Sequence, residues 1–168
     1  MNKVKFVDVY KLPNFEDNRG SFSNWLPHVR GIFRSSPEQI NISHNYNKGT
    51  IRGLHYQKLP EKKIVTCLNG KIFDVVVDCR VTSATYGEVQ FVTLDSKLQN
   101  YVVVPEGCAH GFQTITDNAI LLYFHDTKFD KKGELGINAF DPILQIPWPL
   151  QVSEVSERDL NLPNFNLI

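Results

Sequence analysis

Residues 71–79 read KIFDVVVDC, a long apolar run that follows Asn69-Gly70, the strongest short hairpin signal in the chain. Its side chains alternate with the two-residue period of a β-strand, so that Asp74 and Asp78 share one face. The run before the turn, residues 64–68, is also apolar. This stretch therefore predicts a strand on each side of a tight turn, joined as a β-hairpin.

Similar short apolar segments recur on both sides of this stretch, at spacings near ten residues and with turn residues between them. The other predicted strands are residues 4–10, 21–26, 39–44, 50–57, 89–94, 101–104, 111–116 and 119–125. Helical character is limited to residues 95–99 and 153–160, where Ser156 and Asp159 match a capping box. The pattern predicts an all-β, antiparallel jelly-roll (cupin-type) β-sandwich with a few short helices, whose interior can hold a ligand.

The composition agrees with a strand-rich single domain. The chain has sixteen Val and twelve Ile against four Ala and one Met, and β-branched residues favour strands. Its length of 168 residues predicts one domain over residues 1–168. Eighteen basic residues balance eighteen acidic ones, which argues against binding to nucleic acid. No apolar run approaches the roughly 20 residues of a membrane span, and the first residues lack a secretory signal, so we expect a cytoplasmic protein.

Three stretches carry side chains suited to chemistry. In residues 50–57, strand alternation places Arg52 on one face and His55 on the other. The Gly-rich residues 105–112 deliver His110 to the start of a strand, and residues 119–125 carry Tyr123. Taken alone, each of these residues is also compatible with a structural role in a sandwich core.

Two histidines on neighbouring strands first suggest a metal site. Each stretch, however, offers a single His, and no carboxylate lies at the spacing of a two-His, one-carboxylate centre. The residue spacing therefore argues against a metal site.

Ordered blocks over nearly the whole chain resemble the dTDP-4-keto-6-deoxyglucose 3,5-epimerase family, the metal-free branch of the cupins. These blocks are IRGLHYQ (51–57), the lysine eight positions after its His (Lys63), GKIFDVVVDCR (70–80), TYGE (85–88), VPEGCAHGF (104–112), LLYFHDTKF (121–129), IPWP (146–149) and SERD (156–159). The resemblance implies an isomerase that inverts C3, C5 or both in a nucleotide-linked 4-keto-6-deoxy sugar. It would do so by removing and returning a proton through an enolate, and the resemblance implies that no metal or other cofactor is needed.

The resemblance also implies roles for four residues. His55 would be the base, Asp141 the carboxylate that orients it, and Tyr123 the acid on the opposite face of the sugar. Lys63 would stabilise the enolate oxygen. On sequence alone, Asp141 is equally a turn residue before Pro142, and Lys63 a solvated lysine.

Further residues match the substrate-binding positions of the family. The residues that the resemblance assigns to substrate binding are Arg52, His110, Arg19, Phe22, Gln39, Asn41, Gln57, Asn24 and Phe129. Residues 1–30 or so would be exchanged with the partner in a homodimer, bringing Arg19 to phosphate and Phe22 to the base. The tail from about residue 150 to 168 would pack outside the barrel.

Two positions depart from the family pattern. Phe129 stands where a second Tyr is typical, which keeps the ring but loses the hydroxyl, and Asn24 stands where a Glu is usual. The change at Asn24 raises the hypothesis of a nucleotide other than dTDP.

Two other functions remain open from the sequence. One is a related cupin that moves the carbonyl, a nucleotide-4-keto-sugar 3,4-ketoisomerase, and the other is a non-catalytic sugar-nucleotide binding cupin. Lys63, Tyr123 and Asp141 in family register favour the epimerase.

Overall fold

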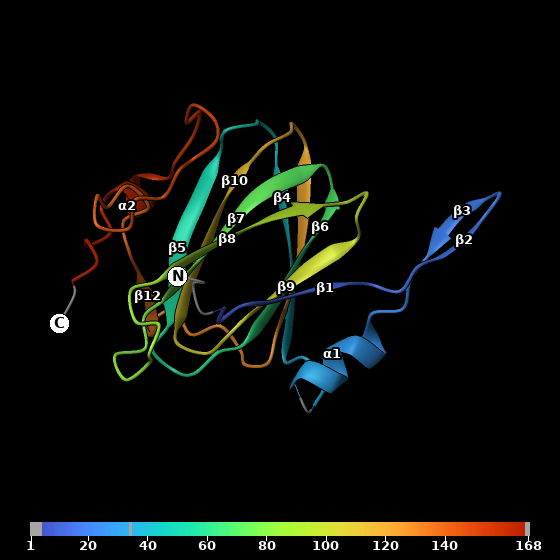
Figure 1. The fold of residues 1–168 in the computed structure, drawn as a ribbon, viewed down its shortest axis with the longest axis horizontal. Coiled ribbons are helices and arrows are strands. Elements are labelled where there is room, and N and C mark those ends of the chain that lie inside the picture. The colour runs from blue at the N-terminus through green and yellow to red at the C-terminus, as the bar shows by residue number, and fades with distance from the viewer. Residues whose placement is uncertain (1–4, 34, 167–168) are drawn as a thin grey trace.

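The computed structural model describes residues 5–33 and 35–166, which form two facing β-sheets flanked by short helices (Figure 1). The order of sheet I is β1 (Asp8–Lys11), β9 (Asn100–Val104), β6 (Lys63–Asn69), β11 (Ala119–His125), β4 (Gln39–Asn45). The order of sheet II is β12 (Glu134–Gly136), β5 (Ile51–Gln57), β10 (Cys108–Thr114), β7 (Lys71–Asp78), β8 (Val89–Asp95). Every pairing in both sheets is antiparallel. The predicted antiparallel jelly-roll sandwich is confirmed.

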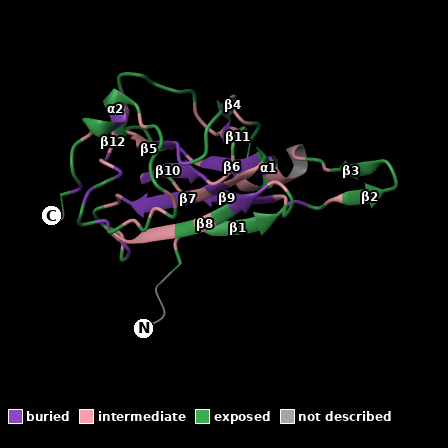
Figure 2. Cartoon of the chain, turned by 90° about the horizontal axis from the view of Figure 1, so that it is seen from above, coloured by how far each residue is buried: buried purple, intermediate pink, exposed green. Residues whose placement is uncertain are grey.

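Three apolar layers pack between and outside the sheets. Figure 2 shows buried residues along central strands such as β6, β7 and β10. The layer between the sheets includes Val65, Val76, Val102, Phe112 and Leu121, all at most 2% exposed. Because strand side chains alternate, each strand that contributes to this layer also presents residues to an outer face.

The outer faces are partly covered by non-strand segments. On sheet II, Leu144 and Phe165 of the C-terminal segment pack with Leu54 of β5. On sheet I, helix α1 (Leu26–Phe33) packs Val29 against the apolar side chains of β9 and β11. These segments cover part of each outer face, whereas Ile40 and Ile42 of β4 are 55% and 59% exposed.

Three local predictions differ from the structure. Asn69-Gly70 does turn the chain, with Gly70 at a φ of 81°, but the hairpin prediction is wrong because β6 pairs in sheet I and β7 in sheet II. Residues 21–26 are not one strand, because β3 (Gly20–Phe22) ends early and α1 begins at Leu26. Residues 95–99 form a hydrogen-bonded turn rather than a helix, with Leu98 N–H donating to the Asp95 carbonyl.

The predicted capping at Ser156 is confirmed. Helix α2 (Glu157–Leu160) has Ser156 as its N-cap, and the Ser156 hydroxyl accepts from Asp159 N–H at 3.0 Å. Neither described helix has the length or apolar character of a membrane-spanning segment.

A two-stranded hairpin projects away from the sandwich. It consists of β2 (Phe15–Asp17) and β3, which pair only with each other (Figure 1). Phe15 and Phe22, opposite each other across this hairpin, are 69% and 68% exposed. This chain leaves the apolar face of its own hairpin uncovered.

Candidate active site

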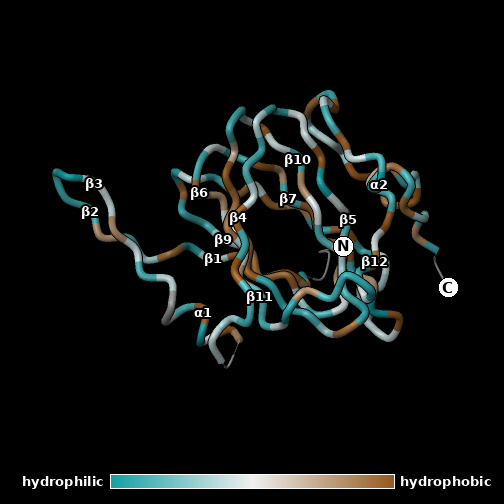
Figure 3. The backbone as a smooth tube through the Cα atoms, turned by 180° about the vertical axis from the view of Figure 1, so that it is seen from behind, coloured by the Kyte–Doolittle hydropathy of each residue, from teal (hydrophilic) through white to brown (hydrophobic). Residues whose placement is uncertain are grey.

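The strands of the two sheets surround a common centre, with β4 and β11 across from β5 and β12 (Figure 3). A cavity of about 1080 Å³ lies there, lined by strands of both sheets and by α2. This volume lies just above the usual range for small-molecule sites, about 300–1000 Å³. Predicted site residues that line the cavity are Asn41, Arg52, His55, Gln57, Lys63, His110, Tyr123 and Phe129.

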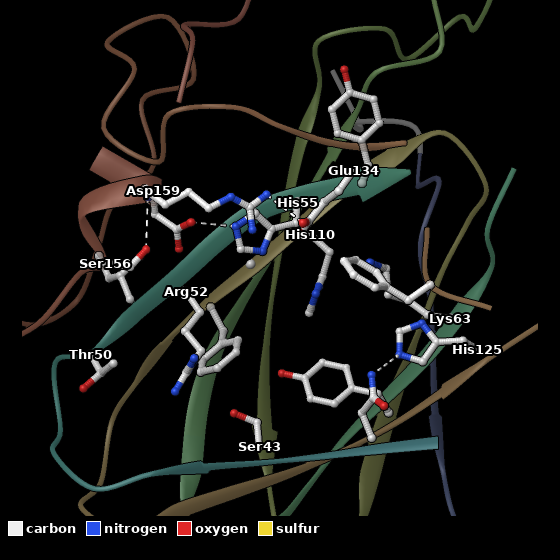
Figure 4. A pocket seen from close by; sticks show the side chains of 18 of the residues that line it. Ser43, Thr50, Arg52, His55, Lys63, His110, His125, Glu134, Ser156 and Asp159 are labelled. Carbon is white, nitrogen blue, oxygen red and sulfur yellow. Dashed lines mark hydrogen bonds and ion pairs between the residues drawn. The ribbon is translucent and has the colours of Figure 1, made fainter. Parts of the chain in front are cut away.

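His55 is paired with a buried carboxylate at the cavity wall (Figure 4). Its Nε2 lies 2.7 Å from Oδ1 of Asp159, which is 5% exposed, and the other oxygen of Asp159 accepts from Gly53 N–H. Burial raises the pKa of Asp159, but the hydrogen bonds from His55 and Gly53 outweigh it and lower the pKa overall. An ionised Asp159 holds the hydrogen on Nε2, so Nδ1 of His55 is left with its lone pair.

The prediction that Asp141 orients His55 is wrong. Both oxygens of Asp141 accept backbone hydrogen bonds, one from Ile143 N–H at 2.8 Å and the other from Phe165 N–H. Asp141 is buried and ties the C-terminal segment to the turn after Pro142. It is the turn residue that the sequence also allowed.

Arg52 and His55 both line the cavity, although simple alternation places them on opposite faces of β5. The pairing of β5 with β10 shifts register between His110 and Phe112, a β-bulge, so that His110 pairs with His55 and Phe112 with Arg52. A Cβ on Gly53 would lie 2.7 Å from Gly111 Cα, so the close approach of the two strands requires glycine there.

His110 and Tyr123 form a second group in the cavity. His110 Nε2 lies 2.7 Å from Oδ2 of Asp74, and both residues are at least 94% buried. Oδ1 of Asp74 has no hydrogen-bond partner within residues 5–33 and 35–166. Burial and, next, the charge of Asp74 raise the pKa of Tyr123, whose ring meets that of His110 edge-on at 6.3 Å. The phenol of Tyr123 therefore keeps its proton at neutral pH, as an acid must.

Lys63 is buried, which contradicts the alternative of a solvated lysine. Only 7% of the residue is exposed, and its Nζ lies 3.3 Å from Oε2 of Glu61. Oε1 of Glu61 accepts in turn from Nδ1 of His125 at 2.9 Å. Buried lysines are rare without such a partner.

Besides Asp141, four predicted residues do not line the cavity of their own chain. Arg19 lies on the projecting hairpin with its side chain 86% exposed and paired with Asp17, and Phe22 and Asn24 follow it. Gln39 stands beside the cavity, where its amide accepts from Phe129 N–H and donates to Asn41.

Sequence reasoning did not assign Asp159, Glu61 or His125 to the site. Asp159 had a visible signal, since it ends the SERD block and its capping box. A capping-box carboxylate should reach back to the N-cap backbone, whereas that of Asp159 turns to His55. Nothing in the sequence pointed to Glu61 or His125 except that Glu61 lies two residues before Lys63 and His125 two residues after Tyr123. Among the described residues, no group of three or more His, Cys, Asp or Glu is placed to hold a metal ion.

Comparisons with known proteins agree on one family. Residues 2–166 match the family model described as dTDP-4-dehydrorhamnose 3,5-epimerase. The chain is 38% identical over 158 residues to the dTDP-4-dehydrorhamnose 3,5-epimerase of Mycobacterium tuberculosis, covering 89% of this chain and 78% of that protein. It is also 38% identical to a dTDP-4-dehydrorhamnose 3-epimerase of Streptomyces niveus, covering 85% and 72%.

A solved structure gives the same result at the level of the fold. The Bacillus anthracis dTDP-4-dehydrorhamnose 3,5-epimerase, crystallised with TDP and PPi bound, superposes with a TM-score of 0.88 at 32% identity, covering 95% of this chain and 94% of that one.

Proposed function

Since the chain belongs to the dTDP-4-dehydrorhamnose 3,5-epimerase family, we infer that it is an isomerase acting on a nucleotide-linked 4-keto-6-deoxy sugar. It inverts C3, C5 or both, the carbons beside the ketone. We propose that His55 and Tyr123 carry the proton transfers and that Lys63 stabilises the enolate formed between them. The expectation of a cytoplasmic location stays a prediction.

The proposed reaction has two proton transfers. Nδ1 of His55 takes the proton from the carbon, and the electron pair of that C–H bond moves to the ketone oxygen, forming an enolate. Asp159 stabilises the imidazolium of His55, and the Lys63 ammonium stabilises the enolate oxygen. Tyr123 then donates its phenolic proton to the opposite face of the carbon, which inverts it. Exchange with water resets both groups.

The observation that carries the proposal is the placement of base and acid on opposite sheets. His55 stands on β5 of sheet II, oriented by Asp159, whereas Tyr123 stands on β11 of sheet I. A substrate between the sheets meets a proton acceptor on one side and a proton donor on the other. A ketoisomerase needs no donor on the opposite face, and a binding protein needs neither group.

The test is the configuration of the product. Incubation with dTDP-4-keto-6-deoxyglucose should yield a sugar inverted at C3, C5 or both, identified from its proton coupling constants. A product whose carbonyl has moved to C3 would instead establish the ketoisomerase. A sugar that stays unchanged, with this and with other nucleotide-linked 4-keto sugars, would favour the binding protein.

Replacing the acid separates the two proton transfers. Tyr123→Phe should lower net inversion by about 10²-fold or more, because the ring stays but the proton donor is lost. Uptake of solvent deuterium at the same carbon should fall less, because His55 can still remove the proton. Comparison of both rates by NMR checks this, with Tyr46→Phe, an exposed tyrosine, as the control. Inversion at the parent rate would show that another group is the acid.

We further propose a homodimer in which the hairpin of one protomer reaches the cavity of the other. The support is the exposure of Phe15, Phe22 and Arg19 on the projecting hairpin, together with the absence of Arg19 and Phe22 from the lining of the described cavity. Arginine suits a diphosphate, and a phenyl ring can stack on a nucleotide base.

Loss of the hairpin contacts should weaken binding rather than chemistry. Arg19→Ala should raise KM by about 10- to 100-fold with kcat within about twofold, because a charge-assisted hydrogen bond to phosphate contributes roughly 1.5–3 kcal/mol. Glu16→Ala, on the other face of the hairpin, is the matched control. A fully active monomer in analytical ultracentrifugation would contradict the shared site.

A further inference from the structure

A row of hydrogen-bonded side chains crosses sheet I beside the proposed acid, and it consists of Lys63, Glu61, His125, Asn41 and Gln39. The mechanism above uses only Lys63. His125 of β11 stands directly opposite Lys63 of β6 on one side and opposite Gln39 of β4 on the other. Tyr123 lies two residues before His125, so the rings share a face and stack at 6.1 Å. The row therefore lies on the same wall of the cavity as the acid.

Within this row, Glu61 connects Lys63 to His125. One of its oxygens lies 3.3 Å from Lys63 Nζ and the other 2.9 Å from His125 Nδ1, so both are occupied. The segment that carries Glu61 is itself held, because Lys62 N–H donates to Asp126 Oδ1 and Asp126 N–H donates to the Lys62 carbonyl. Glu61 is 6% exposed, and at that depth a carboxylate needs partners for its charge.

The direction of each hydrogen bond in the row follows from a backbone N–H. Phe129 N–H donates to Gln39 Oε1, so the Gln39 amide nitrogen faces Asn41 and donates to its Oδ1. The Asn41 amide nitrogen is then the atom 3.4 Å from His125 Nε2, which must accept. The hydrogen of a neutral His125 consequently lies on Nδ1, where it is donated to Glu61.

The electrostatics of Glu61 agree with this direction. Burial raises the pKa of Glu61, but the hydrogen bond from His125 and the charge of Lys63 outweigh it, and the pKa is lowered overall. Glu61 is thus an ionised acceptor with two donors, one of which is the ammonium that faces the cavity.

We propose that Glu61 and His125 are positioning residues, Glu61 holding the Lys63 ammonium at the cavity wall and His125 fixing the carboxylate of Glu61. The proposal rests on the proposed role of Lys63 at the enolate oxygen. Because a displacement of about 1 Å in a catalytic group can cost roughly 10²-fold, a loosened ammonium should reduce kcat while substrate binding is retained.

The principal variant is Glu61→Gln. Its amide nitrogen must face either His125 Nδ1–H or the Lys63 ammonium, so one of the two contacts becomes donor against donor. We expect kcat to fall by about 10- to 100-fold, with KM and the Kd for dTDP within about threefold. Glu106→Gln, an exposed glutamate on the loop after β9, is the matched control.

Variants at His125 provide a rescue test. Asn can place an amide N–H near the position of Nδ1, whereas Leu fills similar space without a donor. His125→Asn should therefore retain kcat within about threefold, and His125→Leu should lower it by about tenfold. If Glu61→Gln fails to fold, Glu61→Asp keeps the charge but is one methylene too short to reach both partners, and it should also lower kcat.

A spectroscopic measurement tests the row without any substrate. In ¹⁵N NMR of the ligand-free protein, neutral His125 should carry its hydrogen on Nδ1, where Glu61 accepts it. A different tautomer would overturn the proposal. So would wild-type kcat in Glu61→Gln and His125→Leu, or a parallel fall of kcat, dTDP affinity and Tm with no rescue by Asn. If the wild-type protein turned over no nucleotide-linked 4-keto sugar, the proposed function would fail. The tautomer of His125 would still show whether its hydrogen bonds to Glu61 and Asn41 run in the proposed direction.

Discussion

His55→Ala is expected to lower epimerisation by at least about 10²- to 10⁴-fold and to abolish uptake of solvent deuterium at every carbon of the sugar. The reason is that His55 is the group proposed to break the C–H bond, and its Nδ1 is left free by the pairing of Nε2 with Asp159. Loss of the imidazole removes the first step, and no later group can then act. Deuterium uptake by mass spectrometry measures that step alone.

The control for this variant is His28→Ala, on α1 at the outer face of sheet I. It should leave uptake unchanged. Substantial residual uptake in His55→Ala, with the fold intact, would mean that a different base removes the proton.

Asp159→Asn should lower kcat by about 10²- to 10⁴-fold with little change in KM, because an amide neither fixes the Nε2–H tautomer of His55 nor stabilises the imidazolium.

Asp141→Asn should show the opposite pattern, a loss of stability with activity retained. It should lower the free energy of unfolding by about 1–3 kcal/mol, since the N–H of Ile143 or of the buried Phe165 loses its acceptor, and leave kcat nearly unchanged.

Steady-state kinetics and thermal unfolding of the two variants decide which aspartate serves His55. If Asp141→Asn lost activity and Asp159→Asn kept it, the hydrogen bond between His55 and Asp159 would have no catalytic role.

The sheet architecture could be predicted because its causes are local. Alternation of apolar and polar residues over residues 71–79 and 119–125 reflects which side of a strand is buried, so the sequence contains that information. Asn69-Gly70 shows the limit. A turn dipeptide specifies that the chain reverses, but which sheet receives the next strand depends on pairing with β8 and β10.

The site was harder to predict from the sequence, because its contacts depend on which distant segments meet in the fold. The His55–Asp159 contact joins residues 104 positions apart, and nothing near either one specifies the other. The bulge that turns Arg52 to the side of His55 depends on the close approach of β5 and β10. In the sequence, Lys63 and Glu61 have the pattern of solvent-exposed charges. Their pairing inside the cavity wall depends on β11, which places His125 against Glu61.

The proposed reaction removes a proton from one face of the carbon beside the ketone and returns a proton from the other face. The most direct measurement is proton NMR of the wild-type protein with dTDP-4-keto-6-deoxyglucose in D₂O. We expect loss of the H3 signal, the H5 signal or both, together with the inverted product. Full retention of both signals with this and other nucleotide-linked 4-keto sugars, by folded protein that binds dTDP, would contradict the proposed reaction.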